Sequence, residues 1–207
     1  MRIRMLTLVA ALVAAAVPAG AGAQFGQYHA DFPKVREQVL RKEARQAAYT
    51  LMIAAAHVRE EVGRAREGEV GERLLAAESR LDQLVARLRG GDAPPLDALD
   101  DAFAATDRLL AEHHLRLASW GWSTVRATSG HQIGHDLGRA AFHFTRAVRY
   151  EDRTLDAASQ QAVAEAERVA GLVSSAAGEL PKETGTAIAA LQRVIVPPQV
   201  IAQQARQ

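Results

Sequence analysis

Cysteine is absent from this chain of 207 residues, and aromatic residues make up only 5% of it. Without cysteine there is no disulfide, no thiolate zinc site, no iron–sulfur cluster, no haem attached through a CxxCH motif and no cysteine nucleophile. A chain of this length can bury enough apolar surface to fold without disulfides. The lack of cysteine therefore excludes several classes of site without restricting the fold.

The sequence also lacks an excess of charge of one sign. Its 25 basic and 24 acidic residues nearly balance, whereas nucleic-acid-binding domains are usually clearly basic. No segment has the basic face that a membrane-surface helix needs. Beyond the N-terminal leader, no run approaches the roughly 20 apolar residues that span a bilayer. We therefore expect no nucleic-acid partner and no membrane-spanning segment in the mature protein.

Residues 1–23 are typical of a secretory signal peptide. Arg2 and Arg4 give a positive start, and Leu6–Val17 is a short apolar run that ends before a small-x-small cleavage motif at Ala21–Ala23. This run of about 12 residues is too short for a transmembrane helix. The sequence therefore predicts an exported bacterial protein, periplasmic or secreted, that is soluble after cleavage.

The rest of the chain has the apolar spacing of α-helices and no strand-like runs. The spacing predicts helices over residues 33–68, 69–89, 95–119, 129–150, 154–178 and 182–195. The first would be roughly 50 Å long. We therefore predict an all-α, up-down helical bundle of five to six helices. Residues 24–196 would form a single domain, and 197–207 a loosely ordered tail.

The expected helix over 95–119 has the most regular apolar stripe. Spacings of four and three alternate along it through Leu99, Phe103, Thr106, Leu110, His113, Leu117 and Trp120. His113 therefore takes a core position, where an imidazole needs a hydrogen-bond partner, a water or a ligand. The segment that begins at Trp120-Gly121-Trp122 is expected to be a connection or a loosened helix.

In the expected helix over 129–150, apolar residues occupy one face, and His131 and His135 lie nearly opposite. Gly134 and Gly138 lie between these faces, at positions where another backbone can approach closely. The remaining arc, expected to face solvent, carries Arg139, Arg146 and Arg149. Two occupied faces indicate contacts on both sides of this helix.

Two pairs of possible metal ligands have helical spacing. His131 and His135 are four residues apart, so they project on the same side of a helix and can share one metal ion. Gln132 stands where a zinc metalloprotease needs glutamate, which argues against that class. His57 and Glu61 form a second pair one turn apart. In an up-down bundle the histidines of the three helices would lie at one end, so the candidate metal ligands are His113, His131, His135, His57 and Glu61.

The two pairs resemble parts of the pattern of the hemerythrins, four-helix bundles with a di-iron site. The resemblance implies that His57 and Glu61 match one motif and that His131 and His135 match another. The HxxxxD motif that should follow is missing, and His113 lies where that family has no ligand. The paired ExxH motifs of ferritin-like di-iron proteins are missing as well.

Haem b is another possible cofactor. Exported four-helix cytochromes hold haem without covalent attachment, between a histidine and a methionine on facing helices. His113 and Met52 are the residue types available for this role. Only the kinds of element match here, because no haem-binding motif surrounds either residue.

Catalytic patterns are lacking. No serine has the surroundings of a nucleophile elbow, and Gly90-Gly91 lacks the lysine and the spacing of a phosphate-binding loop. We therefore expect that the protein is not an enzyme. The preferred hypothesis is a structural or partner-binding role, with a protein partner or a second copy of the chain. The alternative is a periplasmic protein that binds a transition metal or haem through its histidine cluster.

Overall fold

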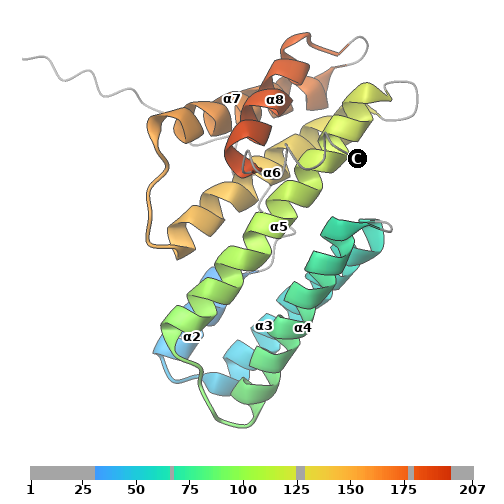
Figure 1. Cartoon of the computed structure of the whole chain (residues 1–207). Coiled ribbons are helices and arrows are strands. Elements are labelled where there is room, and N and C mark those ends of the chain that lie inside the picture. Colours follow the sequence, from blue (N-terminus) through green and yellow to red (C-terminus); the bar gives the residue numbers. More distant parts are fainter. Residues whose placement is uncertain (1–30, 66–67, 125–128, 177–179, 197–207) are drawn as a thin grey trace, which may run out of the picture.

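Residues 31–65, 68–124, 129–176 and 180–196 are described in a computed structural model of the protein. They form seven α-helices in an up-down arrangement (Figure 1), namely α2 Phe32–Leu40, α3 Ala44–Arg64, α4 Glu69–Arg89, α5 Leu96–Ser123, α6 Gly130–Tyr150, α7 Ala157–Ser175 and α8 Glu183–Ile195. The predicted all-α class is confirmed, with seven helices in place of the expected five to six. None of these helices is long and apolar enough to cross a membrane. The expected signal peptide and tail lie outside the described residues.

The N-terminal helical region is divided, so the expected single helix over 33–68 is wrong. The Asp31 side chain caps α2 by accepting a hydrogen bond from the Lys34 amide. At Lys42 the backbone has φ of +62°, a left-handed conformation that cannot continue an α-helix. The chain therefore turns between α2 and α3, at the gap in the apolar pattern near Lys42 and Glu43.

Helix α5 is longer than expected. It continues through Trp120-Gly121-Trp122 to Ser123, so the segment taken for a connection or a loosened helix is α-helical. Gly121 is buried, and Trp122 packs against Gly185 of α8. Packing against α8 explains why a glycine between two tryptophans does not end the helix. Figure 1 shows α5 running the length of the molecule, with α3 and α4 on one side and α6, α7 and α8 on the other.

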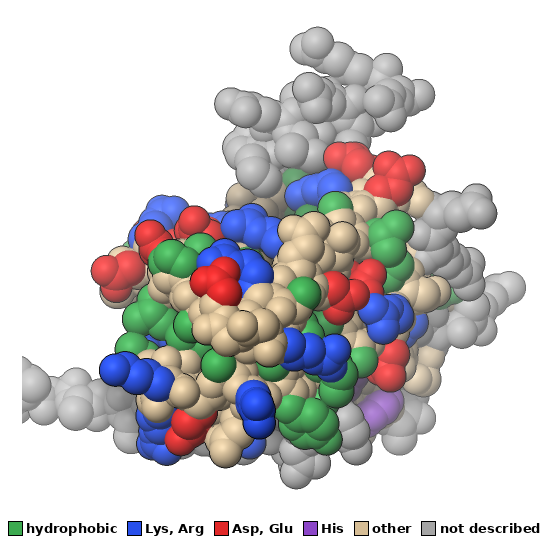
Figure 2. All heavy atoms as spheres, turned by 90° about the horizontal axis from the view of Figure 1, so that it is seen from below, with side chains coloured by type: hydrophobic (Ala, Val, Ile, Leu, Met, Phe, Trp, Pro, Cys, Tyr) green, Lys and Arg blue, Asp and Glu red, His purple; other side chains and the backbone are tan. Residues whose placement is uncertain are grey.

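The core has two hydrophobic clusters that share α5. One joins α2, α3, α4 and the first half of α5, and in it the rings of Phe32 and Phe103 stack at 4.4 Å. The other joins the second half of α5 to α6, α7 and α8. On the face seen in Figure 2, positive and negative side chains are interspersed, in keeping with the balanced composition. The two clusters leave a place between them, at the middle of α5, for polar side chains.

Close packing of α6 on α7 depends on Gly134. A Cβ atom added to Gly134 would lie 2.4 Å from Ser174 Oγ and 2.6 Å from the Ala170 carbonyl oxygen. Only glycine leaves room for this approach, as its place between the two faces of the helix predicts. The face of α6 away from α7 is thereby set against α5 and brings its polar residues toward α3.

Candidate metal centre

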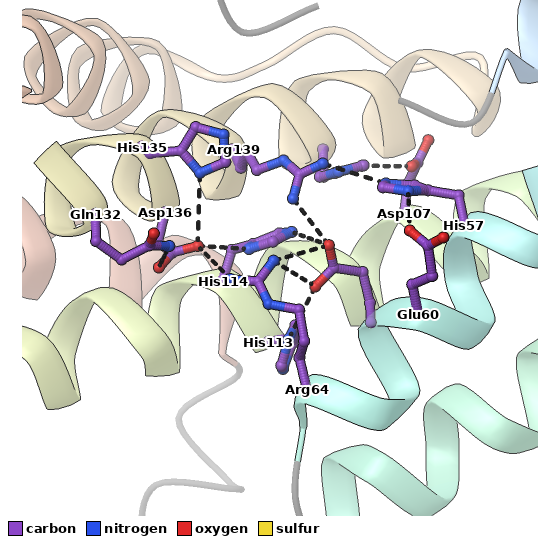
Figure 3. Close-up of polar contacts among 12 residues, drawn as sticks. His57, Glu60, Arg64, Asp107, His113, His114, Gln132, His135, Asp136 and Arg139 are labelled. Atoms are coloured by element: carbon purple, nitrogen blue, oxygen red, sulfur yellow. Dashed lines mark hydrogen bonds and ion pairs between the residues drawn. The ribbon is translucent and has the colours of Figure 1, made fainter. Parts of the chain in front are cut away.

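A cluster of buried polar side chains lies where α3, α5 and α6 meet (Figure 3). We call it the polar cluster, and its members are Glu61, Asp107, His113, His114, Asp136, Arg139 and His143, each at most 4% exposed. Burying so many ionisable groups is costly unless they are paired. The contacts within the cluster therefore decide what it can do.

Two aspartate–histidine pairs join α5 to α6. Asp136 Oδ1 lies 3.0 Å from His114 Nδ1, and Asp107 Oδ1 lies 2.8 Å from His143 Nδ1. Each pair takes its aspartate from one helix and its histidine from the other. This follows from a shared pattern, because each helix carries an aspartate and, two turns later, a histidine. With the helices antiparallel, each aspartate faces the histidine of its neighbour.

Glu61, His113 and His114 form a group that could hold one metal ion. One ligand atom from each lies within 4.8 Å of the other two, and all three residues are buried. His113 Nε2 is 3.3 Å from Glu61 Oε2, and His114 Nε2 is 3.9 Å from Glu61 Oε1. Ligand atoms about 2.0–2.2 Å from a shared metal are themselves separated by roughly 3–4 Å. The Glu/His/His group is thus close to the spacing of a metal site.

The neutral form of His114 leaves its Nε2 atom, a possible metal ligand, directed at Glu61. Burial lowers the pKa of His114 to about 4, so its ring is neutral near pH 7. In the tautomer that donates Nδ1–H to Asp136, Nε2 carries a lone pair. Nε2 has no hydrogen-bond partner among the described residues. A carboxylate bound to the distal nitrogen is the arrangement that orients most metal-binding histidines.

Glu61 is ionised. Burial alone would raise the pKa of its carboxyl, but the surrounding imidazoles and guanidinium groups hold that pKa below its ordinary value. His113 Nε2, although close to the carboxylate, has no hydrogen-bond partner in the described part of the chain. The lone pair of His114 Nε2 thus faces Glu61 Oε1 at 3.9 Å, an oxygen that already accepts hydrogen bonds from Arg139 and Arg64. A cation bound between these two atoms would contact both.

Guanidinium groups already supply positive charge to Glu61. Arg139 Nη1 donates to Oε1 at 2.8 Å, and Arg64 Nη1 lies 3.1 Å from both carboxylate oxygens. Arg139 is 4% exposed, and the Arg64 side chain is 42% exposed. A metal ion bound to Glu61 would have to compete with these groups. Arg64 has solvent to move into, and Arg139 does not.

The structure brings together three of the five residues that the sequence singles out, around Glu61. His57 Nε2 lies 3.2 Å from Arg139 Nη2, so His57 and Glu61 converge on one guanidinium. His113 is buried as expected. His131 is exposed, and the His135 side chain is 31% exposed with its Nδ1 3.9 Å from Asp136 Oδ1. His131 and His135 lie outside the Glu/His/His group.

Met52, the possible haem ligand, is 36% exposed. Its sulfur lies 2.9 Å from Arg89 Nη2 of α4. No contact in the described structure brings it to His113. Haem binding between His113 and Met52 therefore stays a prediction, and no contact among the described residues supports it.

Sequence reasoning missed several members of the polar cluster. His114 and His143 lie off the helix faces that the apolar pattern defines, yet both are fully buried. The solvent arc expected for α6 is wrong at two of its three arginines, because Arg139 and Arg146 are buried or nearly so and only Arg149 is exposed. Arg146 binds Asp107 through two contacts of 2.6 Å. The repeated aspartate–histidine spacing on α5 and α6 is the signal that points to these residues.

Comparisons of the chain with protein-family models, with curated proteins and with solved structures found no match.

Proposed function

We propose that this protein binds one transition-metal ion through Glu61, His113 and His114, as part of an exported, periplasmic or secreted protein. The observation that carries the proposal is the Glu/His/His group itself, in which three buried ligand atoms lie within 4.8 Å of one another. The contact of 3.0 Å between Asp136 and His114 supports it, because it holds the imidazole with Nε2 toward Glu61.

The ligand set favours a borderline divalent metal. Two imidazoles and one carboxylate suit iron(II), cobalt(II) or zinc(II), whereas calcium and magnesium prefer oxygen ligands alone. Three protein ligands leave further coordination positions open. The buried surroundings make an unpaired Glu61 charge costly, and the positive charge of Arg139 and Arg64 offsets that cost in the described structure.

Cobalt(II) is the sharpest probe, because its visible absorption reports the ligand field. Protein freed of metal with EDTA is titrated with cobalt(II), and bound metal is counted by elemental analysis. We expect one ion per chain and a rise in melting temperature, since an ion that binds only the folded state stabilises it. His114→Gln should weaken the affinity by more than about tenfold.

His131→Gln is the matched control, since His131 is exposed and outside the group. It should leave the spectrum and the affinity unchanged. Circular dichroism of the metal-free variants separates lost binding from lost folding. No binding at millimolar metal, or equal affinity in the His114→Gln protein, would falsify the proposal. Loss of binding in the His131→Gln protein alone would place the metal at the surface pair His131 and His135.

Self-association is the second candidate function, and an exposed apolar row on α3 favours it. Tyr49 and Ile53 lie one turn apart and are 63% and 53% exposed, and Met52 beside them is 36% exposed. Exposed large apolar side chains in a row are typical of interaction surfaces. We propose that a second copy of the chain packs on this row. A dimer in sedimentation velocity that becomes a monomer in Ile53→Glu supports this, and a monomer at all concentrations contradicts it.

A further inference from the structure

A cleft opens beside His113, between the C-terminal end of α3, the start of α4 and the second half of α5. Its volume is about 480 Å³, and its described lining consists of Gly63, Arg64, Ala65, Gly68, Val70, Gly71, His113, Arg116, Leu117 and Trp120. Clefts of roughly 300–1,000 Å³ are the usual size of small-molecule sites. Two of the lining residues, Arg64 and His113, also contact Glu61.

The charged side chains on the described walls of the cleft are both arginines, Arg64 and Arg116. Both line the cleft, and each side chain is a little over 40% exposed. No aspartate or glutamate belongs to the described lining. A guanidinium offers paired donors in a plane, the geometry that matches a carboxylate.

The carboxylates that pair with these arginines lie behind the walls, and each is shared between two guanidinium groups. Arg116 shares Glu112 with Arg73, at 2.8 Å and 3.1 Å. Arg64 shares Glu61 with Arg139 in the same way. Each carboxylate thus serves two guanidinium groups in close contact. The next nearest carboxylates lie farther away, Asp136 at 3.8 Å from Arg64 and Glu69 at 3.9 Å from Arg73.

The rest of the cleft wall is apolar or lacks a side chain. Leu117 is half-buried and Trp120 is 51% exposed, so both present apolar surface to the cleft. At Gly63 and Gly68 a Cβ atom would meet nothing within 4 Å, which leaves the space open. His113 also lies on the cleft wall and is 3% exposed, with its Nε2 3.3 Å from Glu61 Oε2.

We propose that this cleft binds a small carboxylate with an apolar body. The carboxylate pairs with Arg116 and Arg64, and the body lies against Trp120 and Leu117. The proposal goes beyond metal binding and does not depend on it, because the arginines and the cleft are present without a metal. Since His113 belongs to both, a bound carboxylate lies next to the Glu/His/His group.

Benzoate is the probe, and benzamide, which has the same shape without the charge, is its control. Trp122→Phe leaves Trp120 as the single tryptophan of the chain, so its fluorescence reports on the cleft. Titrations are made on protein that has been freed of metal with EDTA and then dialysed free of EDTA, with benzoate binding also followed by NMR of backbone amides. We expect saturable binding of benzoate, with shifts of amide resonances at residues 63–65, 68–71 and 113–120, and binding of benzamide at least about tenfold weaker.

Arg116→Gln in the same background should weaken benzoate binding at least about tenfold and leave the fold intact. The matched control is Arg149→Gln, a change at an exposed arginine of α6 away from the cleft. Equal binding of benzoate and benzamide overturns the proposal, as does equal binding by the Arg116→Gln and Arg149→Gln proteins or no saturation. Because these titrations use metal-free protein, failure here leaves the cobalt(II) result standing, and failure of cobalt(II) binding leaves this one standing.

Discussion

The imidazole rings of His114 and His143 lie parallel, with centroids 5.7 Å apart and 9° between their planes. One ring comes from α5 and the other from α6, and each is bound through Nδ1 to an aspartate of the opposite helix. Both rings are fully buried. Sliding α5 against α6 by one turn would break both pairs, so the stack fixes the register of the two helices.

Stability should fall as the pH drops from about 6.5 towards 4. Burial lowers the pKa of His114 to about 4 and holds that of His143 well below its ordinary value. The unfolded chain, with histidine pKa values near 6.5, therefore binds more protons than the folded chain in this window. The free energy of unfolding is therefore highest above about pH 6.5. It falls as the pH drops through this window, by up to ~1.4 kcal/mol per pH unit for each histidine. Urea unfolding at a series of pH values from 7 to 4.5, in EDTA, measures how steeply the free energy of unfolding depends on pH.

His114→Gln removes one of the histidines whose pKa burial lowers, a set that also includes His57, so the free energy of unfolding of this variant should depend less steeply on pH. The exposed His131 provides the control variant His131→Gln, in which this dependence should be unchanged. The pKa values of Glu61 and Asp136 are held below the ordinary range, so their contribution is lost only at still lower pH. Equal stability at pH 7 and pH 5 contradicts the prediction.

Removing Asp107 should destabilise the fold strongly. Its carboxylate, fully buried, accepts from Arg146 and His143, and Asp107→Ala leaves a guanidinium without its buried counter-charge. Losing one partner of a buried ion pair costs about 3–5 kcal/mol. Chemical denaturation measures the loss. Asp101→Ala on the exposed face of α5 should stay within about 0.5 kcal/mol of the natural protein; similar losses in both variants would count against the prediction.

Gly134→Ala should be destabilising, by about 1–3 kcal/mol, because the new Cβ would overlap Ser174 and the Ala170 carbonyl on α7. The comparison is Gly171→Ala on α7, where a Cβ meets nothing within 4 Å. That variant should gain up to about 1 kcal/mol, because alanine is the better helix former. In thermal unfolding, the melting temperature should fall in Gly134→Ala and rise in Gly171→Ala. Changes of the same sign would show that α6 and α7 are not packed this closely.

Asp136→Asn should weaken metal binding while leaving it detectable. The neutral amide that replaces the carboxylate would be a poorer acceptor for His114 Nδ1–H, and loss of such a carboxylate typically costs about 10–100-fold in metal affinity. Competition with a chromophoric chelator gives the affinities. Gln132→Ala removes the amide that holds the other carboxylate oxygen at 2.8 Å and should have a smaller effect. A larger effect at Gln132 would mean that Asp136 does not act through His114.

Much of the fold follows from apolar spacing alone. The boundaries of α4, α6 and α8 are close to those predicted, and His113 takes the core position that the stripe through Leu99 and Leu110 assigns to it. The break at Lys42 was visible only as a gap in the pattern, since a left-handed residue has no signature when it is lysine. The end of α5 was misjudged because packing on α8, which is not local in sequence, overrides the glycine.

The site could be predicted only in part. Spacing along one helix relates His57 to Glu61 and His131 to His135, but it says nothing of which helix faces which. The partners of Glu61 on other helices come from α5 and α6, and two of them, His114 and Arg139, lie outside any apolar face. A polar side chain can be buried where a residue of a neighbouring helix pairs with it. A sequence pattern that only separates apolar from polar residues does not show such pairing, so it predicts that these side chains face solvent.

Helix α5 belongs to both hydrophobic clusters, whereas α3 and α4 reach the α6–α8 half chiefly through that helix and through Glu61. This predicts an order of opening under native conditions. Amide hydrogens of α4 should exchange by a partial unfolding that leaves α5 and α6 protected, because cooperative units follow the contacts that bind them. An ion held by Glu61 from α3 and by two histidines of α5 would join these units and suppress that partial opening.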